Sequence, residues 1–67
     1  MLSARNQFQG TVKSVKLGNV MAEVILTVAG VEVVSVITRE SAERMKLKAG
    51  DTATAVIKST EVMVSKD

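Results

Sequence analysis

Two short polar stretches near opposite ends of the chain carry the side chains that could do chemistry. Residues 3–7 (SARNQ) offer a hydroxyl, a guanidinium and two carboxamides without an acidic group, and residues 58–60 (KST) offer an ammonium and two hydroxyls. All of these groups can donate hydrogen bonds, so both stretches suit an anion with several oxygen atoms. The competing interpretation is that Arg5 and Lys58 are solvated surface charges beside ordinary strand ends. Residue type and spacing leave both interpretations open.

Length and composition limit how such groups can be held in place. A chain of 67 residues is expected to form one domain, spanning residues 1–67. A domain of this size buries only about 60% of the surface that its unfolded chain exposes. The chain has no Cys and no His, so neither a disulfide nor the usual structural zinc site can reinforce it. Association with copies of itself is therefore the expected source of further stability.

The same composition argues against several classes of protein. No basic segment followed by an apolar run begins the chain, and no stretch approaches the roughly 20 apolar residues of a membrane span, so we expect a cytoplasmic protein with no membrane partner. The net charge of +2 is dispersed and Phe8 is the single aromatic residue, which disfavours nucleic-acid binding. Without His, Cys or a paired-carboxylate motif, the sequence does not predict an enzyme.

The elements that must position the polar stretches begin with a strand over residues 8–17. Its apolar alternation holds through Val12 and then changes parity at Val15, which predicts a β-bulge near residues 13–14. Gly10 suits a strong bend or the close approach of another backbone. Residues 18–19 (Gly-Asn) predict a two-residue hairpin turn, because both residue types tolerate positive φ.

Two further strands follow, over residues 20–29 and 31–37, with Gly30 as the turn between them. In the first of them, the even-numbered residues from 20 to 28 face one way, while Met21 and Ile25 lie on the other face. Both strands are apolar on both faces, which predicts burial on both. One face would fill the domain's own barrel, and Met21 and Ile25 would meet a second subunit.

A short helix is expected after these strands, with Thr38 as its N-cap and Glu40 in its first turn. Ala42, Met45 and Ala49 would form its buried side. Exposed amides and the hydroxyls of Thr38 and Ser41 make this helix start a second candidate anion site. Simple capping by Thr38 is the alternative.

A turn at residues 49–51 leads to a fourth strand over residues 52–59, and residues 62–64 predict a brief fifth strand. In the fourth strand Ala53, Ala55 and Ile57 share one face. The expected fold is therefore all-β, a five-stranded barrel of the OB type with one short helix between its third and fourth strands.

Four of these segments together resemble one family. SARNQ at residues 3–7, Gly10, ITRES at 37–41 and AVIKST at 55–60 resemble the molbindins, small molybdate-binding proteins built from a Mop domain, over residues 2–64. The resemblance implies a cytoplasmic protein that binds molybdate or tungstate for storage or homeostasis, with no metal cation as cofactor. It also implies a homohexamer, a trimer of dimers, with oxyanions held where subunits meet. The chain departs from the family at Lys46, where a Gly is usual near the end of the helix.

Carried over position by position, the resemblance implies an oxyanion site formed partly from different subunits. Its residues would be Ser3, Ala4 through its backbone amide, Arg5, Asn6, Thr38, Ser41, Lys58 and Ser59. A second kind of oxyanion site is implied as well, without an assignment of its residues. Two alternatives stay open: a regulatory or structural OB-like interaction module without physiological oxyanion binding, and a molybdenum-pterin as the ligand.

Overall fold

A four-stranded sheet and one short helix make up the fold. The computed structural model describes residues 4–66. The elements in chain order are β1 (Asn6–Leu17), β2 (Met21–Val28), β3 (Val31–Thr38), α1 (Arg39–Arg44), β4 (Thr52–Ile57) and the 3₁₀ turn η1 (Ser59–Glu61). No helix in this part of the chain is long and apolar enough to cross a membrane. The all-β class and the helix between the third and fourth strands are as predicted.

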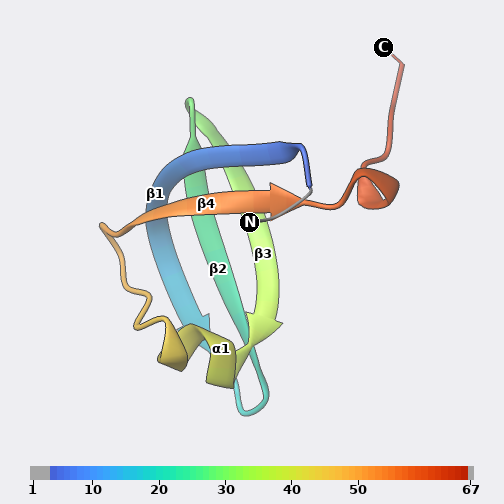
Figure 1. The fold of residues 1–67 in the computed structure, drawn as a ribbon. Helices are drawn as coiled ribbons and strands as arrows, with labels where there is room; N and C mark the ends of the chain where they lie inside the picture. The colour runs from blue at the N-terminus through green and yellow to red at the C-terminus, as the bar shows by residue number, and fades with distance from the viewer. Residues whose placement is uncertain (1–3, 67) are drawn as a thin grey trace.

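The strand β1 is the centre of the sheet because it pairs with two different strands. The order is β3-β2-β1-β4, and every pairing is antiparallel. The first half of β1, from Asn6 to Thr11, pairs with β4, while Thr11 to Leu17 pairs with β2. Figure 1 shows the sharp curve of β1 that lets one strand serve both neighbours. This curl gives the sheet its OB-like shape and leaves β3 and β4 as its two edges.

The curve coincides with the predicted bulge. The register of β1 against β2 shifts between Val12 and Ser14, which confirms the prediction made from the change of parity. Val12 is the most deeply buried large side chain, at 1% exposure. Its amide donates to the carbonyl of Asp51 and its carbonyl accepts from the amide of Gly50, each at 2.8 Å. The bend is therefore held by both the core and the loop before β4.

Gly10 lies where β1 passes close to β2, as the sequence predicted. A Cβ at this position would lie 2.3 Å from the carbonyl oxygen of Thr27 and 2.7 Å from a methyl group of Val28. Real Cβ atoms do not approach backbone oxygen so closely, so a side chain here would push the strands apart. The absence of a side chain is what permits the crossing.

The first hairpin turn differs from the prediction. The amide of Gly18 donates to the carbonyl of Met21 at 2.8 Å, so the turn residues are Asn19 and Val20, one position later than expected. None of these residues has positive φ; that conformation occurs in the next turn, at Ala29 (49°) and Gly30 (80°). The register is set by Val15 opposite Val24, because their packing in the core outweighs the local preference of the turn.

The core is small and lies on one face of the sheet. The predicted alternation of β2 is confirmed: Ala22, Val24 and Leu26 are at most 4% exposed. The prediction that Ala53, Ala55 and Ile57 share one face of β4 is confirmed too, since these residues are less exposed than their neighbours in the strand. Among residues 4–66, six apolar residues are buried: Val12, Ala22, Val24, Leu26, Ala42 and Ala55. So few buried side chains make the isolated chain marginally stable.

The helix α1 begins as predicted and ends earlier. Thr38 is its N-cap, and the Thr38 hydroxyl accepts from the amide of Ser41 at 3.1 Å. Ala42 is its buried residue, whereas Met45 is 57% exposed and Ala49 lies beyond the helix, so the predicted three-residue buried side is wrong. A helix of six residues is too short to bury an apolar face that extends to residue 49.

Lys46 takes the place where a glycine would fit at the end of α1. Its φ is +54°, its amide donates to the carbonyl of Glu43 at 3.0 Å, and the amide of Leu47 donates to the carbonyl of Ala42 at 3.2 Å. These two bonds form a Schellman motif, in which the left-handed residue is usually Gly. The end of the helix therefore has the left-handed backbone conformation that glycine usually adopts there, and Lys46 adopts it with strain.

The end of the chain departs most from the predicted fold. The strand β4 stops at Ile57 rather than residue 59, and residues 59–61 form η1. Residues 62–64 pair with no strand in the described part of the chain, and Met63 and Val64 are 93% and 92% exposed. Four strands are present where five were predicted. The predicted fifth strand is therefore wrong, because η1 directs the backbone after it away from the sheet (Figure 1).

Candidate functional site

The first polar stretch is anchored to the end of the sheet through Asn6. Ser3 lies outside the described residues. Ala4 is half-buried and Arg5 is exposed, and both carbonyls accept hydrogen bonds from Gln7, which donates through its side-chain amide to Ala4 and through its backbone amide to Arg5. Gln7 therefore shapes the stretch. The sequence analysis did not assign it a role, although it stands within the SARNQ segment.

Pairing of β1 with β4 brings the second polar stretch alongside the first. Asn6 lies opposite Ile57 in the register, and its side-chain nitrogen is 3.5 Å from the hydroxyl oxygen of Ser59. This distance is at the outer limit of a hydrogen bond, so both groups keep donors available to a ligand. Residues 53 positions apart thus meet at one end of the sheet. We call this group the sheet-end cluster; its members are Ala4, Arg5, Asn6, Lys58 and Ser59.

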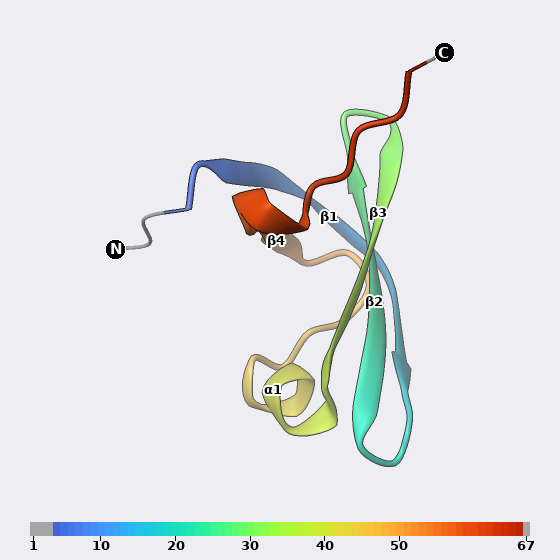
Figure 2. The ribbon, with the colours of Figure 1, turned by 90° about the vertical axis from the view of Figure 1, so that its right-hand side faces the viewer.

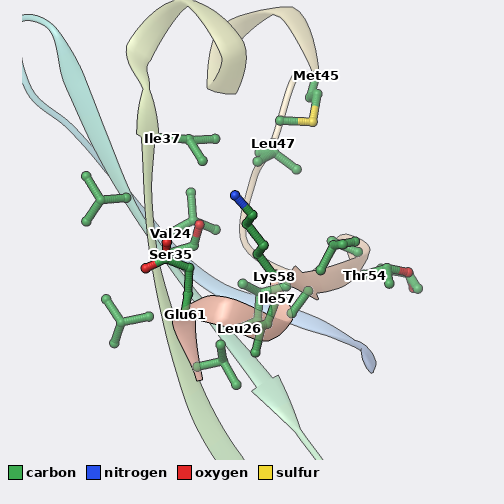
Figure 3. Close-up of a pocket in the computed structure, with 17 residues that line it drawn as sticks. Val24, Leu26, Ser35, Ile37, Met45, Leu47, Thr54, Ile57, Lys58 and Glu61 are labelled. Atoms are coloured by element: carbon green, nitrogen blue, oxygen red, sulfur yellow. The ribbon is translucent and has the colours of Figure 1, made fainter. Parts of the chain in front are cut away.

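The side chain of Lys58 turns into a groove on the inner face of the sheet. This open groove, of about 1060 Å³, lies between the β3 and β4 edges and is lined mainly by apolar residues, with Lys58, Glu61 and Ser35 among its polar ones. Figure 3 shows the Lys58 ammonium extending toward Ile37 and Leu47, away from the backbone of η1. The backbone of Lys58 is thus beside Asn6 and Ser59, while its charge points into the groove.

The two cations of the sheet-end cluster differ from most others in having no carboxylate partner. Within residues 4–66, ion pairs join Lys13 to Glu32, Arg39 to Glu43, Arg44 to Glu40 and Lys48 to Asp51. Arg5 and Lys58 appear in none of them. Their charge is therefore available to an anion without first breaking an internal pair.

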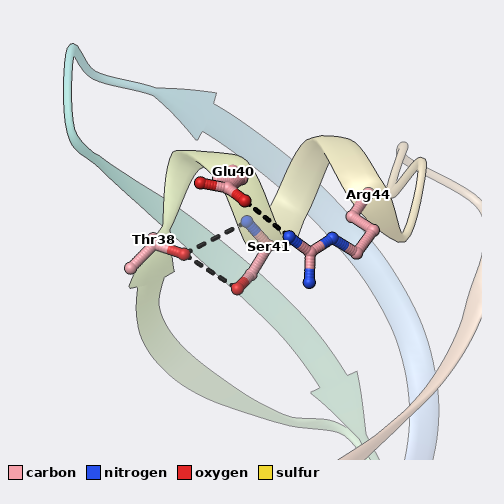
Figure 4. A network of polar contacts seen from close by, with 4 residues as sticks. All are labelled: Thr38, Glu40, Ser41 and Arg44. Carbon is pink, nitrogen blue, oxygen red and sulfur yellow. Dashed lines mark hydrogen bonds and ion pairs between the residues drawn. The ribbon is translucent and has the colours of Figure 1, made fainter.

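The second candidate site, the helix-start cluster, consists of Thr38 and Ser41. Besides capping the helix, the Thr38 hydroxyl donates to the Ser41 hydroxyl oxygen at 2.8 Å (Figure 4). Of the two hydroxyl protons one is therefore used within the pair, and one remains to meet a ligand. The amides of Arg39 and Ser41 are also occupied, by the Val20 carbonyl and the Thr38 hydroxyl.

The surroundings of the helix-start cluster are acidic as well as basic. A shallow hollow of about 480 Å³ beside it is lined by Asn19, Val20, Thr38, Arg39, Glu40 and Glu43. Each carboxylate is paired within the helix: Glu40 accepts from Arg44, as in Figure 4, and Glu43 lies 3.6 Å from Arg39. Arg39 also donates to the carbonyl of Gly18 at 3.2 Å. These charges largely neutralise one another, so the attraction of the hollow for an anion is weak.

The two clusters do not meet within one chain. In Figure 1, α1 lies at one end of the curled sheet, and the start of β1 lies near the end of β4 and η1 at the other. No hydrogen bond in the described part of the chain joins Thr38 or Ser41 to Asn6 or Ser59. Of the eight residues expected to hold one oxyanion, the seven that the structure describes therefore form two separate groups within one chain. The residue pattern had already indicated the helix start as a candidate site of its own, whereas the resemblance combined both groups in one site.

The described residues contain no group of three or more His, Asp, Glu or Cys side chains that could hold a metal ion. The sheet-end cluster offers hydrogen-bond donors and positive charge, and the helix-start cluster offers hydroxyl groups. Such groups recognise a ligand that accepts on every oxygen.

Comparison with known proteins agrees with this donor chemistry. Residues 2–64 match the family model described as the TOBE domain. The molybdenum-pterin-binding protein 3 of Clostridium pasteurianum is 52% identical over 64 residues, which cover 94% of each chain.

Solved structures extend the similarity to the fold. The molybdate-binding protein of Sporomusa ovata superposes with a TM-score of 0.94 at 39% identity, covering 98% of both chains. The molybdate-bound form of ModG, described as a cytoplasmic molybdate-binding protein, gives a TM-score of 0.83 at 44% identity and covers 87% of this chain and 42% of ModG. On sequence and fold together, the chain belongs to the TOBE-domain family and, within it, to the molbindins, the Mop-type molybdate-binding proteins.

Proposed function

We propose that this protein binds molybdate or tungstate through the sheet-end cluster and serves in storage or homeostasis of the oxyanion in the cytoplasm. The observation that carries the proposal is the meeting of Asn6 and Ser59 at the sheet end beside Arg5, a cation without a carboxylate partner among residues 4–66. Lys58 has no such partner either, and its ammonium extends from the sheet end into the neighbouring groove (Figure 3). Membership of the molbindins supports the identity of the ligand.

The chemistry of the ligand explains why a donor-only cluster suits it. Molybdate at neutral pH is a fully deprotonated tetrahedral dianion, so every oxygen accepts hydrogen bonds and none donates. Phosphate keeps a proton at neutral pH and is held best where a strong acceptor such as a carboxylate faces it, and the sheet-end cluster has no carboxylate. Sulfate has the same charge and shape as molybdate, so only the size of the site can reject it. Tungstate is nearly equal in size and should bind equally well.

The site residues we propose are those that the family resemblance implied. The amide of Ala4, Arg5, Asn6, Lys58 and Ser59 come from the sheet end, and Thr38 and Ser41 from the helix start. Ser3 is proposed on the resemblance alone, because it lies outside the described residues. Because the two clusters lie at opposite ends of one chain (Figure 1), a shared anion would need them to come from different subunits. Alternatively, each cluster serves its own kind of site. We propose a homohexamer, a trimer of dimers, with the anions at its subunit interfaces.

Binding at an interface strengthens this interaction. Arg5 is exposed in the single chain, where water screens its charge. Partial burial against a neighbouring subunit lowers the local dielectric constant and raises the attraction between the guanidinium and the anion. The protein acts by binding alone in this proposal, as a single domain and without a catalytic step, a metal cation, a nucleic acid or a membrane.

Native mass spectrometry of the purified protein, with and without molybdate and in excess sulfate, tests the proposal. The expected result is a hexamer that carries several molybdates and keeps them in sulfate. A monomer or dimer without bound molybdate would refute the proposal and favour an interaction module that retains only the fold. Phosphate in place of sulfate is the control for donor-only recognition and should not compete.

A further inference from the structure

The chain turns sharply just before the sheet begins, and two carbonyl groups at this turn lie outside the strand pairing. Figures 1 and 2 both show the change of direction where the backbone enters β1, close to η1. Pairing with β4 starts at Asn6 opposite Ile57, so Ala4 and Arg5 precede the ladder of main-chain hydrogen bonds. Their carbonyls can therefore hold the turn in one conformation only if other donors reach them.

One residue, Gln7, supplies both of these donors. Its side-chain amide donates to the carbonyl of Ala4, three residues back, and its backbone amide donates to the carbonyl of Arg5 at 3.1 Å. The second bond joins residues two positions apart, which is the hydrogen bond of a γ-turn centred on Asn6. A Gln side chain is long enough to reach the first carbonyl and carries the N–H groups to bond it. The turn is thus fixed from within the same short segment.

The two hydrogen bonds hold the two peptide units on either side of Arg5. Each peptide unit is planar, so a residue's φ and ψ describe how the units before and after it are rotated about its Cα. When both units are held, the direction of the Cα–Cβ bond between them is held as well. Gln7 therefore sets the direction in which the side chain of Arg5 leaves the backbone.

Nothing else in the described part of the chain orients the guanidinium. Arg5 is exposed, and among residues 4–66 its side chain takes part in no ion pair and in no side-chain hydrogen bond. The other arginines, Arg39 and Arg44, are each held by a glutamate. For Arg5, the backbone conformation is the one feature in this region that restricts where its charge can lie.

We propose that Gln7 is a positioning residue of the oxyanion site, which orients Arg5 toward the anion before the anion binds. The inference rests on the proposed function, because it assigns a further role at the sheet-end cluster. A guanidinium that already points toward its ligand loses less conformational freedom on binding, so the same charge gives a higher affinity. Gln7 itself touches no ligand in this proposal and acts through Arg5.

The chain offers a matched control at Gln9. Gln9 lies two residues further along β1, so its side chain is on the same face of the strand, and it is exposed like Gln7. Its side chain makes no hydrogen bond to any of residues 4–66. Gln→Met at either position keeps the length of the side chain and removes the amide, but only Gln7→Met removes the bond that holds the turn.

Calorimetric titration with molybdate compares the unmutated protein, Gln7→Met and Gln9→Met. We expect the Kd of Gln7→Met to rise by about three- to tenfold, the equivalent of one net hydrogen bond. The Kd of Gln9→Met should stay within about twofold of the unmutated value, as for other exposed sites. Urea denaturation without ligand should give similar midpoints for the two variants, because both side chains are exposed.

A double variant distinguishes positioning of Arg5 from a general effect on the fold. If Gln7 acts through the guanidinium, Gln7→Met should weaken binding by less than about twofold when Arg5→Ala is already present. The same loss of affinity with and without Arg5 would overturn the inference, because Gln7 would then act on the fold or on another group.

A second measurement needs no oxyanion. Nuclear magnetic resonance relaxation reports the mobility of the Arg5 amide in the free protein, and we expect its order parameter to fall in Gln7→Met and to stay unchanged in Gln9→Met. An unchanged order parameter in Gln7→Met would overturn the inference.

The two proposals fail in different ways. Absence of molybdate binding by the unmutated protein would refute the proposed function and this inference with it. Binding by the unmutated protein, with equal Kd values for Gln7→Met and Gln9→Met, would overturn the role of Gln7 alone.

Discussion

The sheet-end cluster and the helix-start cluster use similar side chains in different ways. Thr38 and Ser41 are three residues apart, and they bond to each other and to the helix that they begin. Asn6 and Ser59 are 53 residues apart and meet only weakly, at 3.5 Å. The two arginines of α1, Arg39 and Arg44, are paired with glutamates, whereas Arg5 and Lys58 have no such partner within residues 4–66.

This difference shows how to separate structural polar groups from groups available to a ligand. In a local motif the polar groups bond to one another, because the residues that need a hydrogen-bond partner are neighbours on one helical turn. A cluster assembled by long-range strand pairing keeps donors and charge that the fold does not use. We therefore expect the sheet-end cluster to dominate anion binding and the helix-start cluster to contribute chiefly to stability.

The largest effect is expected from Gly10→Ala, which disturbs the strand that carries the sheet-end cluster. The new Cβ would meet the Thr27 carbonyl at 2.3 Å, so the first half of β1 must move. We expect a loss of about 3 kcal/mol in the free energy of unfolding, the upper end for overpacking. Urea denaturation measures this. The neighbouring Gln9→Ala, exposed on the other face, should change stability by less than about 0.5 kcal/mol. An unchanged midpoint for Gly10→Ala would show that the crossing of β1 and β2 is looser than described.

Arg5→Ala tests the comparison directly at the sheet end. Loss of a charge-assisted hydrogen bond should weaken molybdate binding by at least about 1.5 kcal/mol. Calorimetric titration with molybdate gives the affinity. The control, Arg44→Ala, removes a cation that is exposed and paired with Glu40, and should change affinity by less than about 0.5 kcal/mol. Equal losses for the two variants would mean that net charge, not the sheet-end cluster, governs binding.

Thr38→Ala tests whether the helix-start cluster serves mainly to stabilise the fold. Removing the hydroxyl that accepts from the Ser41 amide should lower the free energy of unfolding by about 1 kcal/mol, as for other N-caps. Thermal denaturation without ligand measures the loss, and Thr38→Ser should restore most of the stability. A variant that folds with unchanged stability but binds molybdate far more weakly would reverse the roles assigned to the two clusters.

The smallest effect is expected from Lys46→Gly, at the far end of the helix. Lys46 has φ of +54°, a conformation that costs an L-residue about 1–2 kcal/mol. Glycine relieves this strain but loses about 0.5–1 kcal/mol through its freer unfolded backbone. We expect a net gain of about 0.5–1 kcal/mol, measured by urea denaturation, with molybdate affinity unchanged. Reduced stability would mean that the lysine side chain makes contacts that outweigh its backbone strain.

Local patterns predicted much of the fold because their physical causes are local. The change of parity between Val12 and Val15 predicted the bulge, since side chains alternate strictly along a strand. Gly10 predicted the close crossing, and Thr38 predicted the helix start. The first hairpin turn was placed one residue early because Val15 and Val24 pack together in the core and set the register across the strands.

The relation between distant segments could not be predicted in the same way. The apolar residues 62–64 predicted a strand, but pairing needs a partner edge, and the described chain directs this segment away from the sheet. The family resemblance also gave one list of eight oxyanion-binding residues. The structure divides those it describes between two ends of the sheet, and whether subunits reunite them stays a prediction.

The sequence by itself determined the class of fold, the bulge, the helix start and the donor character of both polar stretches. Each of these follows from neighbouring residues, because the sequence gives their spacing and chemistry directly. Only the tertiary structure decided that Asn6 meets Ser59, that Thr38 and Ser41 satisfy each other away from them, and that the β3 edge stays open. These features depend on how β1 curls between β2 and β4, and that curl is set by packing around Val12 rather than by any single segment.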